Sequence, residues 1–255
     1  VGQPICGTEA VASPCTHIGP TMSELPRSIG KYRVERVLGV GASGTVYLAY
    51  DPFRDKWVAI KQIHAHLLDN PAQASRCRQM LHNESILASQ LSHPHIVGLL
   101  DVDELADPPY LVLEYVKGRS LESYTSHDLL LPVSDVMDIG FKCCNALDYA
   151  NQRGLVHRDI KPANLLMGEN GELKLTDFGA AYSLHGEVTQ IGGLVGSPAY
   201  MSPEQIHEQE LTLHSDMFSL AVVLYEMLTG QKPFAGETDY ATMFKISSEP
   251  AVPMR

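Results

Sequence analysis

A short polar stretch between apolar residues, GLVHRDIKPANLL at residues 154–166, holds several groups that could do chemistry. It places a histidine, an arginine, an aspartate, a lysine and an asparagine within residues 157–164, and the amide oxygen of Asn164 could bind a hard cation. A polar turn joining two buried elements would give the same pattern, so the surrounding motifs have to decide between these interpretations.

A second carboxylate, Asp177, ends an apolar strand-like run and is followed by Phe178 and Gly179. A carboxylate at a strand end, next to a glycine that frees the backbone, suits a divalent cation such as Mg²⁺, and Asn164 offers a neutral oxygen for the same ion. A simple hairpin turn is the alternative. It is less favoured, because Asp159, Asn164 and Asp177 lie in one short span.

Lys61 ends the apolar run VAIK, so its ammonium needs an anionic partner or a route to water. Between Lys61 and the end of the helix expected next, the acidic residues are Asp69, outside that helix, and Glu84, within it. We therefore expect a Lys61–Glu84 ion pair that directs the lysine toward the phosphates of a nucleotide. A surface lysine whose stem is buried and whose charge reaches solvent is the alternative.

Three glycines, Gly39, Gly41 and Gly44, lie between two strand-like runs. Because they have no side chains, they let backbone N–H groups approach a phosphate closely. The same spacing occurs in dinucleotide-binding folds, but there a helix follows the last glycine, and here residues 45–50 alternate like a strand. A hairpin that covers phosphates is therefore the preferred interpretation.

The elements that must position these groups follow from the hydrophobic pattern. Alternating apolar and polar residues predict strands within 32–51, 56–63, 95–104 and 109–116. Asn70 and Pro71 predict the start of a helix that continues to residue 91, and apolar spacing predicts a second long helix over 133–152. A later apolar helix is expected to have Asp216 as its N-terminal anchor. The chain thus divides near 114–118 into a strand-rich part with one helix and a helix-rich part.

The composition excludes some partners. A formal net charge of −11 offers no large basic surface, so nucleic acid and anionic membranes are not expected as principal partners. No apolar run is long enough to span a bilayer, and we expect a cytoplasmic chain without a membrane span. Five cysteines without a C-x-x-C pair indicate reduced thiols, and Cys143 and Cys144 fall at the spacing of helical core residues.

In order and roughly in spacing, the glycine run, VAIK with its glutamate, HRD with its asparagine, and DFG resemble the eukaryotic-type protein kinase family, and more closely its bacterial members. The resemblance begins at residue 32 and implies an α+β, bilobal protein-kinase-like fold whose C-lobe lacks its final helices. We expect the chain to consist of a strand-rich N-lobe with one main helix (29–113), a hinge (114–118) and a helical C-lobe (119–255). Residues 1–28 lie outside the resemblance, and their Gly, Pro, Ser and Thr content without a periodic pattern predicts a flexible N-terminal extension.

The resemblance also implies how ATP is bound. Amides of the glycine run would cover its phosphates, and Lys61, paired with Glu84, would hold the α- and β-phosphates. The residues implied to surround the adenine are Val46, Ala59 and Leu166 on its two faces, Leu113 as the gatekeeper, and the backbone of Glu114 and Val116.

For the transfer itself, the resemblance implies four roles. Asp177 and Asn164 would bind Mg²⁺, with Mn²⁺ as an alternative ion. Asp159 would orient the substrate hydroxyl and accept its proton. Lys161 would contact the transferred phosphate, and a lysine at this position resembles the serine/threonine-specific branch of the family.

Two further residues receive supporting roles from the resemblance. Ser197 stands where the family usually has a threonine that bridges the catalytic aspartate and lysine, and its hydroxyl can make the same hydrogen bonds. His157 matches an internal hydrophobic stack that includes Phe178, so we expect a core residue rather than an acid or base.

The function implied is that of a protein serine/threonine kinase that depends on ATP and Mg²⁺ and acts on protein substrates. Phosphorylation of its own loop at Thr189 or Ser183, with Arg158 as the partner of the phosphate, is the expected control. A pseudokinase scaffold without turnover and a small-molecule phosphotransferase stay open as alternatives, and so does a homodimer.

The chain is also expected to be a fragment of a longer protein. In the family, helices beyond those present here bring an arginine to the position of Glu204, and the only arginine after Glu204 is Arg255. We therefore expect a Glu204 carboxylate without its usual partner and apolar surface left exposed on the helical lobe.

Overall fold

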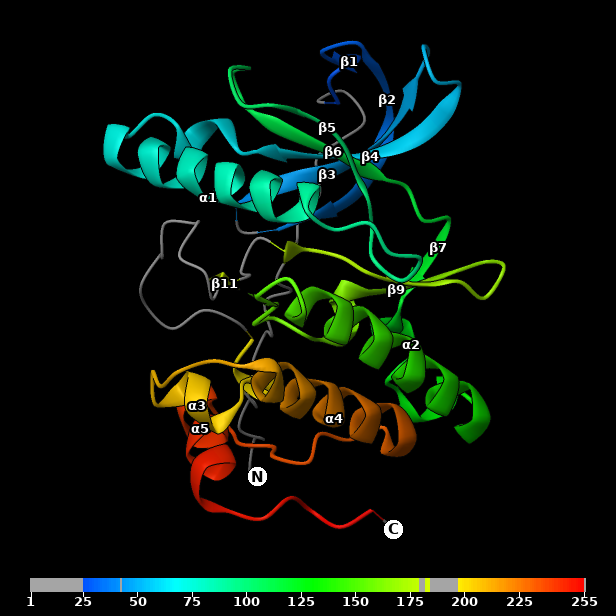
Figure 1. The fold of residues 1–255 in the computed structure, drawn as a ribbon, viewed down its shortest axis with the longest axis vertical. Coiled ribbons are helices and arrows are strands. Elements are labelled where there is room, and N and C mark those ends of the chain that lie inside the picture. The colour runs from blue at the N-terminus through cyan, green and yellow to red at the C-terminus, as the bar shows by residue number, and fades with distance from the viewer. Residues whose placement is uncertain (1–24, 42, 179–181, 184–196, 255) are drawn as a thin grey trace, which may run out of the picture.

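The computed structural model describes residues 25–41, 43–178 and 197–254, together with the backbone of 182–183. Its upper part is built around a curled β-sheet and its lower part from helices (Figure 1). The expected two-lobed α+β fold, strand-rich first and helical later, is confirmed. Within the described ranges, no helix is both long and apolar enough to cross a membrane.

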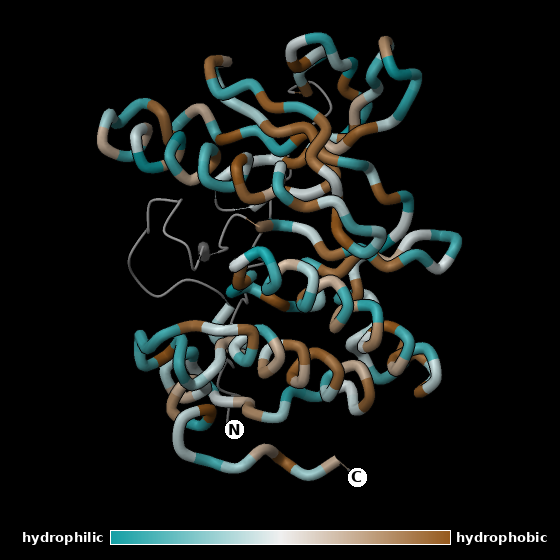
Figure 2. The backbone as a smooth tube through the Cα atoms, in the orientation of Figure 1, coloured by the Kyte–Doolittle hydropathy of each residue, from teal (hydrophilic) through white to brown (hydrophobic). Residues whose placement is uncertain are grey.

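A six-stranded sheet forms the N-lobe, with the strand order β1-β2-β3-β4-β6-β5 and antiparallel pairing throughout. Its strands are β1 (Ser28–Ile29), β2 (Tyr32–Val40), β3 (Gly44–Asp51), β4 (Lys56–Ile63), β5 (Leu99–Asp103) and β6 (Tyr110–Glu114). Val58, Ile60 and Val112 in the central strands are fully buried. Figure 2 shows this concentration of hydrophobic residues in the middle of the sheet. All four predicted strand regions therefore contain strands.

Helix α1 (Pro71–Ser89) packs against β5 and β6 and is the main helix of the N-lobe. Its first turn is capped as predicted, because the side-chain oxygen of Asn70 accepts hydrogen bonds from the backbone N–H of Ala72 at 3.0 Å and of Gln73 at 3.4 Å. The helix ends at Ser89, slightly earlier than the expected residue 91. This helix carries Glu84.

Helices α2 (Val133–Asn151) and α4 (Leu213–Thr229) pack against each other at the centre of the C-lobe (Figure 1). Their buried faces share one hydrophobic core, which includes Ile139, Leu147, Leu220 and Val223. The shorter helices are α3 (Pro203–Ile206), α5 (Asp239–Ser248), and the 3-10 turns η1 (Ala65–Leu67), η2 (Leu121–Tyr124), η3 (His127–Leu129), η4 (Pro162–Asn164) and η6 (Pro198–Tyr200).

The start of α4 corrects one sequence prediction. The helix is capped by Thr212, whose hydroxyl accepts a hydrogen bond from the backbone N–H of His214 at 3.3 Å. The backbone N–H of Thr212 in turn donates to the hydroxyl of Ser215 at 3.3 Å. Asp216 lies inside the first turn and is therefore not the cap. Its carboxylate is directed to the backbone of His157 and Arg158 instead.

Two small sheets support the segments that carry the polar motifs. Strands β7 (Gly118–Ser120), β9 (Leu165–Gly168) and β10 (Leu173–Leu175) form one sheet, and β8 (Leu155–Val156) pairs with β11 (Tyr182–Ser183). Backbone bonds of 2.9 Å join Leu175 to His95 and Val97, in the connection between α1 and β5. The two lobes are thus tied together just before Asp177.

Candidate active site

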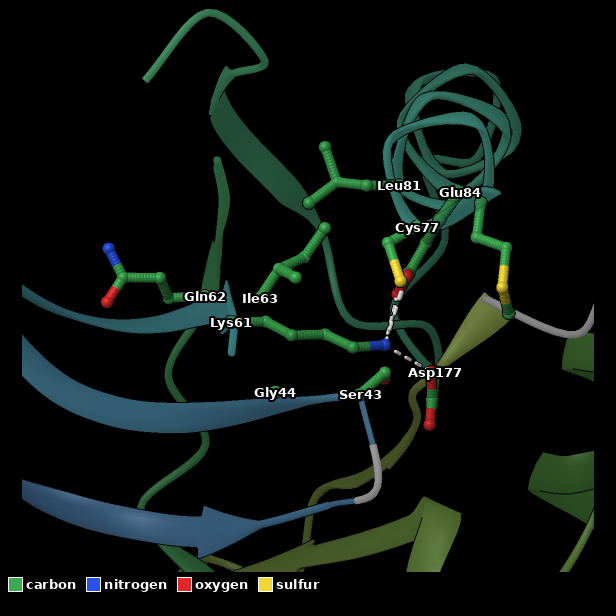
Figure 3. Close-up of a pocket in the computed structure, with 10 residues that line it drawn as sticks. Ser43, Gly44, Lys61, Gln62, Ile63, Cys77, Leu81, Glu84 and Asp177 are labelled. Atoms are coloured by element: carbon green, nitrogen blue, oxygen red, sulfur yellow. Dashed lines mark hydrogen bonds and ion pairs between the residues drawn. The ribbon is translucent and has the colours of Figure 1, made fainter. Parts of the chain in front are cut away.

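Lys61 lies between two carboxylates that come from different parts of the chain (Figure 3). Its Nζ donates to Oε1 and Oε2 of Glu84 at 2.9 and 3.0 Å, and to Oδ1 of Asp177 at 2.7 Å. Burial alone would lower the pKa of Lys61, but the charges of Glu84 and Asp177 outweigh burial and raise that pKa above its ordinary value. The structure therefore contains the expected Lys61–Glu84 pair and keeps the lysine charged.

A cavity of about 190 Å³ opens beside this group. Ser43 and Gly44 line it from the glycine run, and Cys77 and Leu81 line it from α1, while Lys61 reaches across it (Figure 3). The charged groups therefore face a space next to the glycine hairpin, where an anionic ligand could reach them.

The three glycines occupy different surroundings. Strand β3 begins at Gly44 and pairs with β2, so a hairpin is present as expected and the helix required by a dinucleotide-binding fold does not follow, while the phosphate contact stays a prediction. A Cβ on Gly44 would overlap the carbonyl oxygen of Gln62, whereas a Cβ on Gly39 would meet no described atom within 4 Å. Gly41 donates its N–H to the carbonyl of Gly44 at 2.9 Å. The sheet thus requires a glycine at position 44, whereas a Cβ on Gly41 would make only an ordinary contact of 3.7 Å with the carbonyl oxygen of Gly44.

Asp159 is held by hydrogen bonds on both oxygens of its carboxylate. Oδ2 accepts from Nζ of Lys161 at 2.7 Å and from Nδ2 of Asn164 at 3.1 Å. Oδ1 accepts from the backbone N–H of Ser197 at 3.1 Å and from its hydroxyl at 3.3 Å. Lys161 also donates to the Ser197 hydroxyl at 3.0 Å, so serine makes both of the contacts expected at this position. The carboxylate has one fixed orientation.

The backbone before Asp159 is held by a distant carboxylate. Asp216, which is 2% exposed, accepts the N–H of His157 at 2.8 Å and the N–H of Arg158 at 2.9 Å. Arg158 has a φ of 70°, in the left-handed region that a side chain disfavours. No local sequence pattern indicates this contact, because Asp216 is 59 positions from His157 and its place near a helix start has a simpler explanation.

His157 is a core residue, as expected. It is fully buried, its ring packs at 62° to that of Phe178 with the centroids 4.7 Å apart, and its Nε2 lies 3.1 Å from the carbonyl oxygen of Thr176. These contacts link the loop that carries Asp159 to the segment around Asp177.

The residues expected around an adenine come from both lobes. Ala59 of β4 pairs with Leu113 of β6, Val46 of β3 pairs with Lys61, and Leu166 of β9 pairs with Ser120. Val116 follows β6 in the connection between the lobes and is half-buried. The expected adenine contacts therefore come from the N-lobe sheet, from β9 of the C-lobe and from the connection between the lobes.

Glu114, at the end of β6, is held from two sides. Its backbone N–H donates to the carbonyl of Gly98 at 2.8 Å, and its carboxylate accepts a hydrogen bond from Lys174 of β10 at 2.7 Å. No local sequence pattern indicates the Lys174 contact, because its two partners are 60 positions apart. The contact ties the start of the connection between the lobes to the segment before Asp177.

Four further residues named in the sequence analysis differ in what the structure shows of them. Gly179 and Thr189 lie outside the described residues, and for Ser183 only the backbone is described. Glu204, expected to lack an arginine partner, is half-buried and accepts a hydrogen bond from the Ser215 hydroxyl at 2.7 Å, so its carboxylate is not unpaired.

Comparison with known proteins gives a consistent result. A family model described as "Protein kinase domain" matches residues 32–253. The probable serine/threonine-protein kinase PknB of Lactococcus lactis is 35% identical over 221 residues, which cover 86% of this chain and 35% of that protein. The serine/threonine-protein kinase PknB of Mycolicibacterium smegmatis is 36% identical over 230 residues (88% and 36%), and PrkC of Bacillus subtilis is 38% identical over 220 residues (86% and 33%). The chain spans about a third of the length of these curated relatives.

Proposed function

Because this chain belongs to the protein kinase family, we propose that it is a serine/threonine kinase that transfers the γ-phosphate of ATP to hydroxyl groups of protein substrates. Chains of this family use ATP and, in general, a divalent cation. The observation that carries the proposal is the fixed carboxylate of Asp159, which is bonded to both Lys161 and Ser197. Phosphoryl transfer depends mainly on positioning and charge neutralisation, and this arrangement supplies both.

ATP binds between the lobes, with its adenine next to the connection between them. The adenine contacts are made by the side chains of Val46, Ala59, Leu113 and Leu166 and by the backbone of Glu114 and Val116. The N–H of Glu114 already donates to Gly98, so we assign the base contact of Glu114 to its carbonyl oxygen. Gly39, Gly41 and Gly44 let the backbone of the run approach the phosphates closely, with the N–H of Gly41 bonded to the carbonyl of Gly44. Lys61 neutralises phosphate charge while Glu84 holds it in place.

Asp177 and Asn164 fit a hard divalent cation, and we assign Mg²⁺ to them, with Mn²⁺ as an alternative. The hydrogen bonds from Asn164 to Asp159 use the amide nitrogen, so the amide oxygen is the atom that it presents to an ion. The side chain of Asp177 is 41% exposed beside Lys61. Carboxylate and amide oxygens are the donors that Mg²⁺ prefers. When bound, the ion offsets the negative charge of the phosphates.

In the transfer step, Asp159 orients a serine or threonine hydroxyl and accepts its proton. The bond between the γ-phosphorus and the oxygen that bridges to the β-phosphate breaks, a phosphorus–oxygen bond to the hydroxyl forms, and ADP leaves. Lys161 lies 2.7 Å from Asp159 and stabilises the charge of the phosphate in transit. A lysine here and the relatives, which are named serine/threonine-protein kinases, both support serine/threonine specificity.

We also propose that phosphorylation of Thr189 or Ser183 controls activity, with the guanidinium of Arg158 as the partner of the phosphate. The double variant Thr189→Ala with Ser183→Ala should lose the slow rise in activity that self-phosphorylation produces. An unchanged lag and final rate would rule this control out.

Incubation of the chain with labelled ATP, Mg²⁺ and a basic protein tests the proposed function. We expect labelled phosphoserine or phosphothreonine in the protein, and none with the variant Asp177→Asn. ATP binding without transfer would favour a pseudokinase scaffold. Transfer to a small-molecule acceptor but not to protein would favour a small-molecule phosphotransferase.

A further inference from the structure

Gln205 joins the segment after Ser197 to the loop that carries Arg158 and Asp159. It lies in α3 and is 6% exposed. Its Oε1 accepts the backbone N–H of Ser202 at 3.0 Å, and its Nε2 donates to the carbonyl oxygen of Arg158 at 2.8 Å. A backbone N–H can only donate and a carbonyl can only accept, so these partners identify the amide oxygen as the atom facing Ser202 and the amide nitrogen as the atom facing Arg158. Both ends of the side chain are therefore in use.

The carbonyl that Gln205 holds belongs to a residue with a disfavoured backbone conformation. Arg158 has a φ of 70°, and such a conformation persists only where the surroundings fix it. On its N-terminal side, the N–H of Arg158 is fixed by Asp216 at 2.9 Å. On its C-terminal side, the carbonyl is fixed by Gln205. The strained residue is thus held by contacts from outside its own loop on both sides.

The peptide group between Arg158 and Asp159 sets the direction of the Asp159 side chain. If the Arg158 carbonyl were released, rotation of this peptide would move the carboxylate relative to Ser197 and Lys161. Ser197, Ser202 and Gln205 belong to one continuous segment. Placement of that segment and orientation of Asp159 are therefore linked at two points, by the bonds from Ser197 to the carboxylate and by the bond from Gln205 to the peptide that carries it.

We propose that Gln205 is a positioning residue, which fixes the Arg158–Asp159 peptide and so couples placement of residues 197–205 to the orientation of Asp159. The inference rests on the proposed function, because it assumes that Asp159 accepts the substrate proton. Gln205 acts through the Arg158 carbonyl and lies apart from the groups assigned to ATP. Its replacement should therefore lower kcat and leave KM for ATP nearly unchanged.

Two variants of similar size separate the donor from the rest of the side chain. Gln205→Glu keeps the oxygen that accepts from Ser202 but, when ionised, loses the donor to Arg158, and Gln205→Met loses both. At about pH 8 we expect kcat to fall about tenfold in each variant, the value of one hydrogen bond to a buried group. Burial raises the pKa of the introduced carboxyl, and its protonated form can donate again. As the pH is lowered toward about 6, the kcat of Gln205→Glu relative to the wild type should rise, while that of Gln205→Met stays level.

The controls test the alternative of a merely structural role. Ser202→Ala removes the hydroxyl that caps α3, and Gln209→Glu places the same new charge at an exposed position nearby, so both should keep kcat within about twofold of the wild type. Thermal unfolding of each variant shows whether it is folded at the assay temperature. If Gln205→Glu is not folded at that temperature, the kcat of folded Gln205→Met decides whether Gln205 is a positioning residue.

A wild-type kcat in Gln205→Met overturns the inference, and so does a pH response of Gln205→Glu that matches that of Gln205→Met. Asp159→Asn in the same assay separates this failure from failure of the proposed function. That variant should abolish transfer, and if it does not, the proposed role of Asp159 is wrong whatever Gln205 does.

Discussion

Lys61 of β4 and Glu84 of α1 are joined by hydrogen bonds of 2.9 and 3.0 Å, so the position of the helix decides where the lysine points. Glu84→Gln keeps the size of the side chain but removes its charge, which lets Asp177 draw the lysine away from the phosphates. We expect KM for ATP to rise about tenfold, or about 1.4 kcal/mol, in steady-state kinetics. Glu169→Gln, which breaks an exposed pair with Lys117, is the matched control and should leave KM unchanged. Equal KM values in both variants would contradict the assignment.

Gly44 and Gly39 should respond differently to the same substitution. A Cβ on Gly44 would overlap the carbonyl oxygen of Gln62, so Gly44→Ala forces β3 and β4 apart and should lower the free energy of unfolding by about 1–3 kcal/mol. Gly39→Ala should change that free energy by less than about 0.5 kcal/mol but raise KM for ATP, because the methyl group keeps the backbone away from the phosphates. Thermal unfolding and ATP kinetics on both variants make the comparison. Equal loss of stability in both variants would show that the sheet does not require glycine at position 44 more than at position 39.

Asp216 should be needed for stability as well as for activity. Asp216→Asn turns an amide NH₂ toward one of the two backbone N–H groups of His157 and Arg158, which leaves a buried donor without an acceptor. We expect urea denaturation to show a loss of about 2–3 kcal/mol in the free energy of unfolding. Asp138→Asn, which removes an exposed pair with Lys142, should cost no more than about 0.5 kcal/mol. If the two variants are equally stable, the Asp216 carboxylate does not stabilise the fold through the backbone N–H groups of His157 and Arg158.

Cys143 should make stability depend on alkaline pH. Burial raises the pKa of its thiol from 9.0 to about 12. Above about pH 9 the unfolded chain loses this proton while the folded chain keeps it, so the free energy of unfolding falls by about 1.4 kcal/mol per pH unit until about pH 12. Cys143→Val removes this titration. The stability of the wild type relative to Cys143→Val should therefore decrease between about pH 9.5 and 10.5, and a constant difference would contradict the buried thiol.

The features that could be predicted from sequence are those whose partners lie in one local pattern. Asn70 before Pro71 marked the start of α1, because a capping side chain acts on the next few residues. The Lys61–Glu84 pair was predictable because few acidic residues lie between β4 and the end of α1. The order of the motifs then indicated the two-lobed fold.

Contacts between distant segments could not be predicted in this way. Asp216 near a helix start suggested an anchor for that helix, but Thr212 caps it and the carboxylate reaches His157 instead. The bond from Gln205 to the Arg158 carbonyl spans 47 positions and depends on how α3 packs against the loop that carries Arg158. The chain sequence contains no periodicity for such bonds, since packing alone brings their partners together.

The proton-accepting role of Asp159 is tested most directly by single-turnover transfer of labelled γ-phosphate from bound ATP to a protein substrate. Wild type and Asp159→Asn are compared, with ATP affinity measured separately on each. We predict equal affinity for ATP and transfer that is slower by about 100-fold or more in the variant. Transfer by Asp159→Asn at nearly the wild-type rate, or ATP binding by the wild type with no transfer at all, would contradict the account.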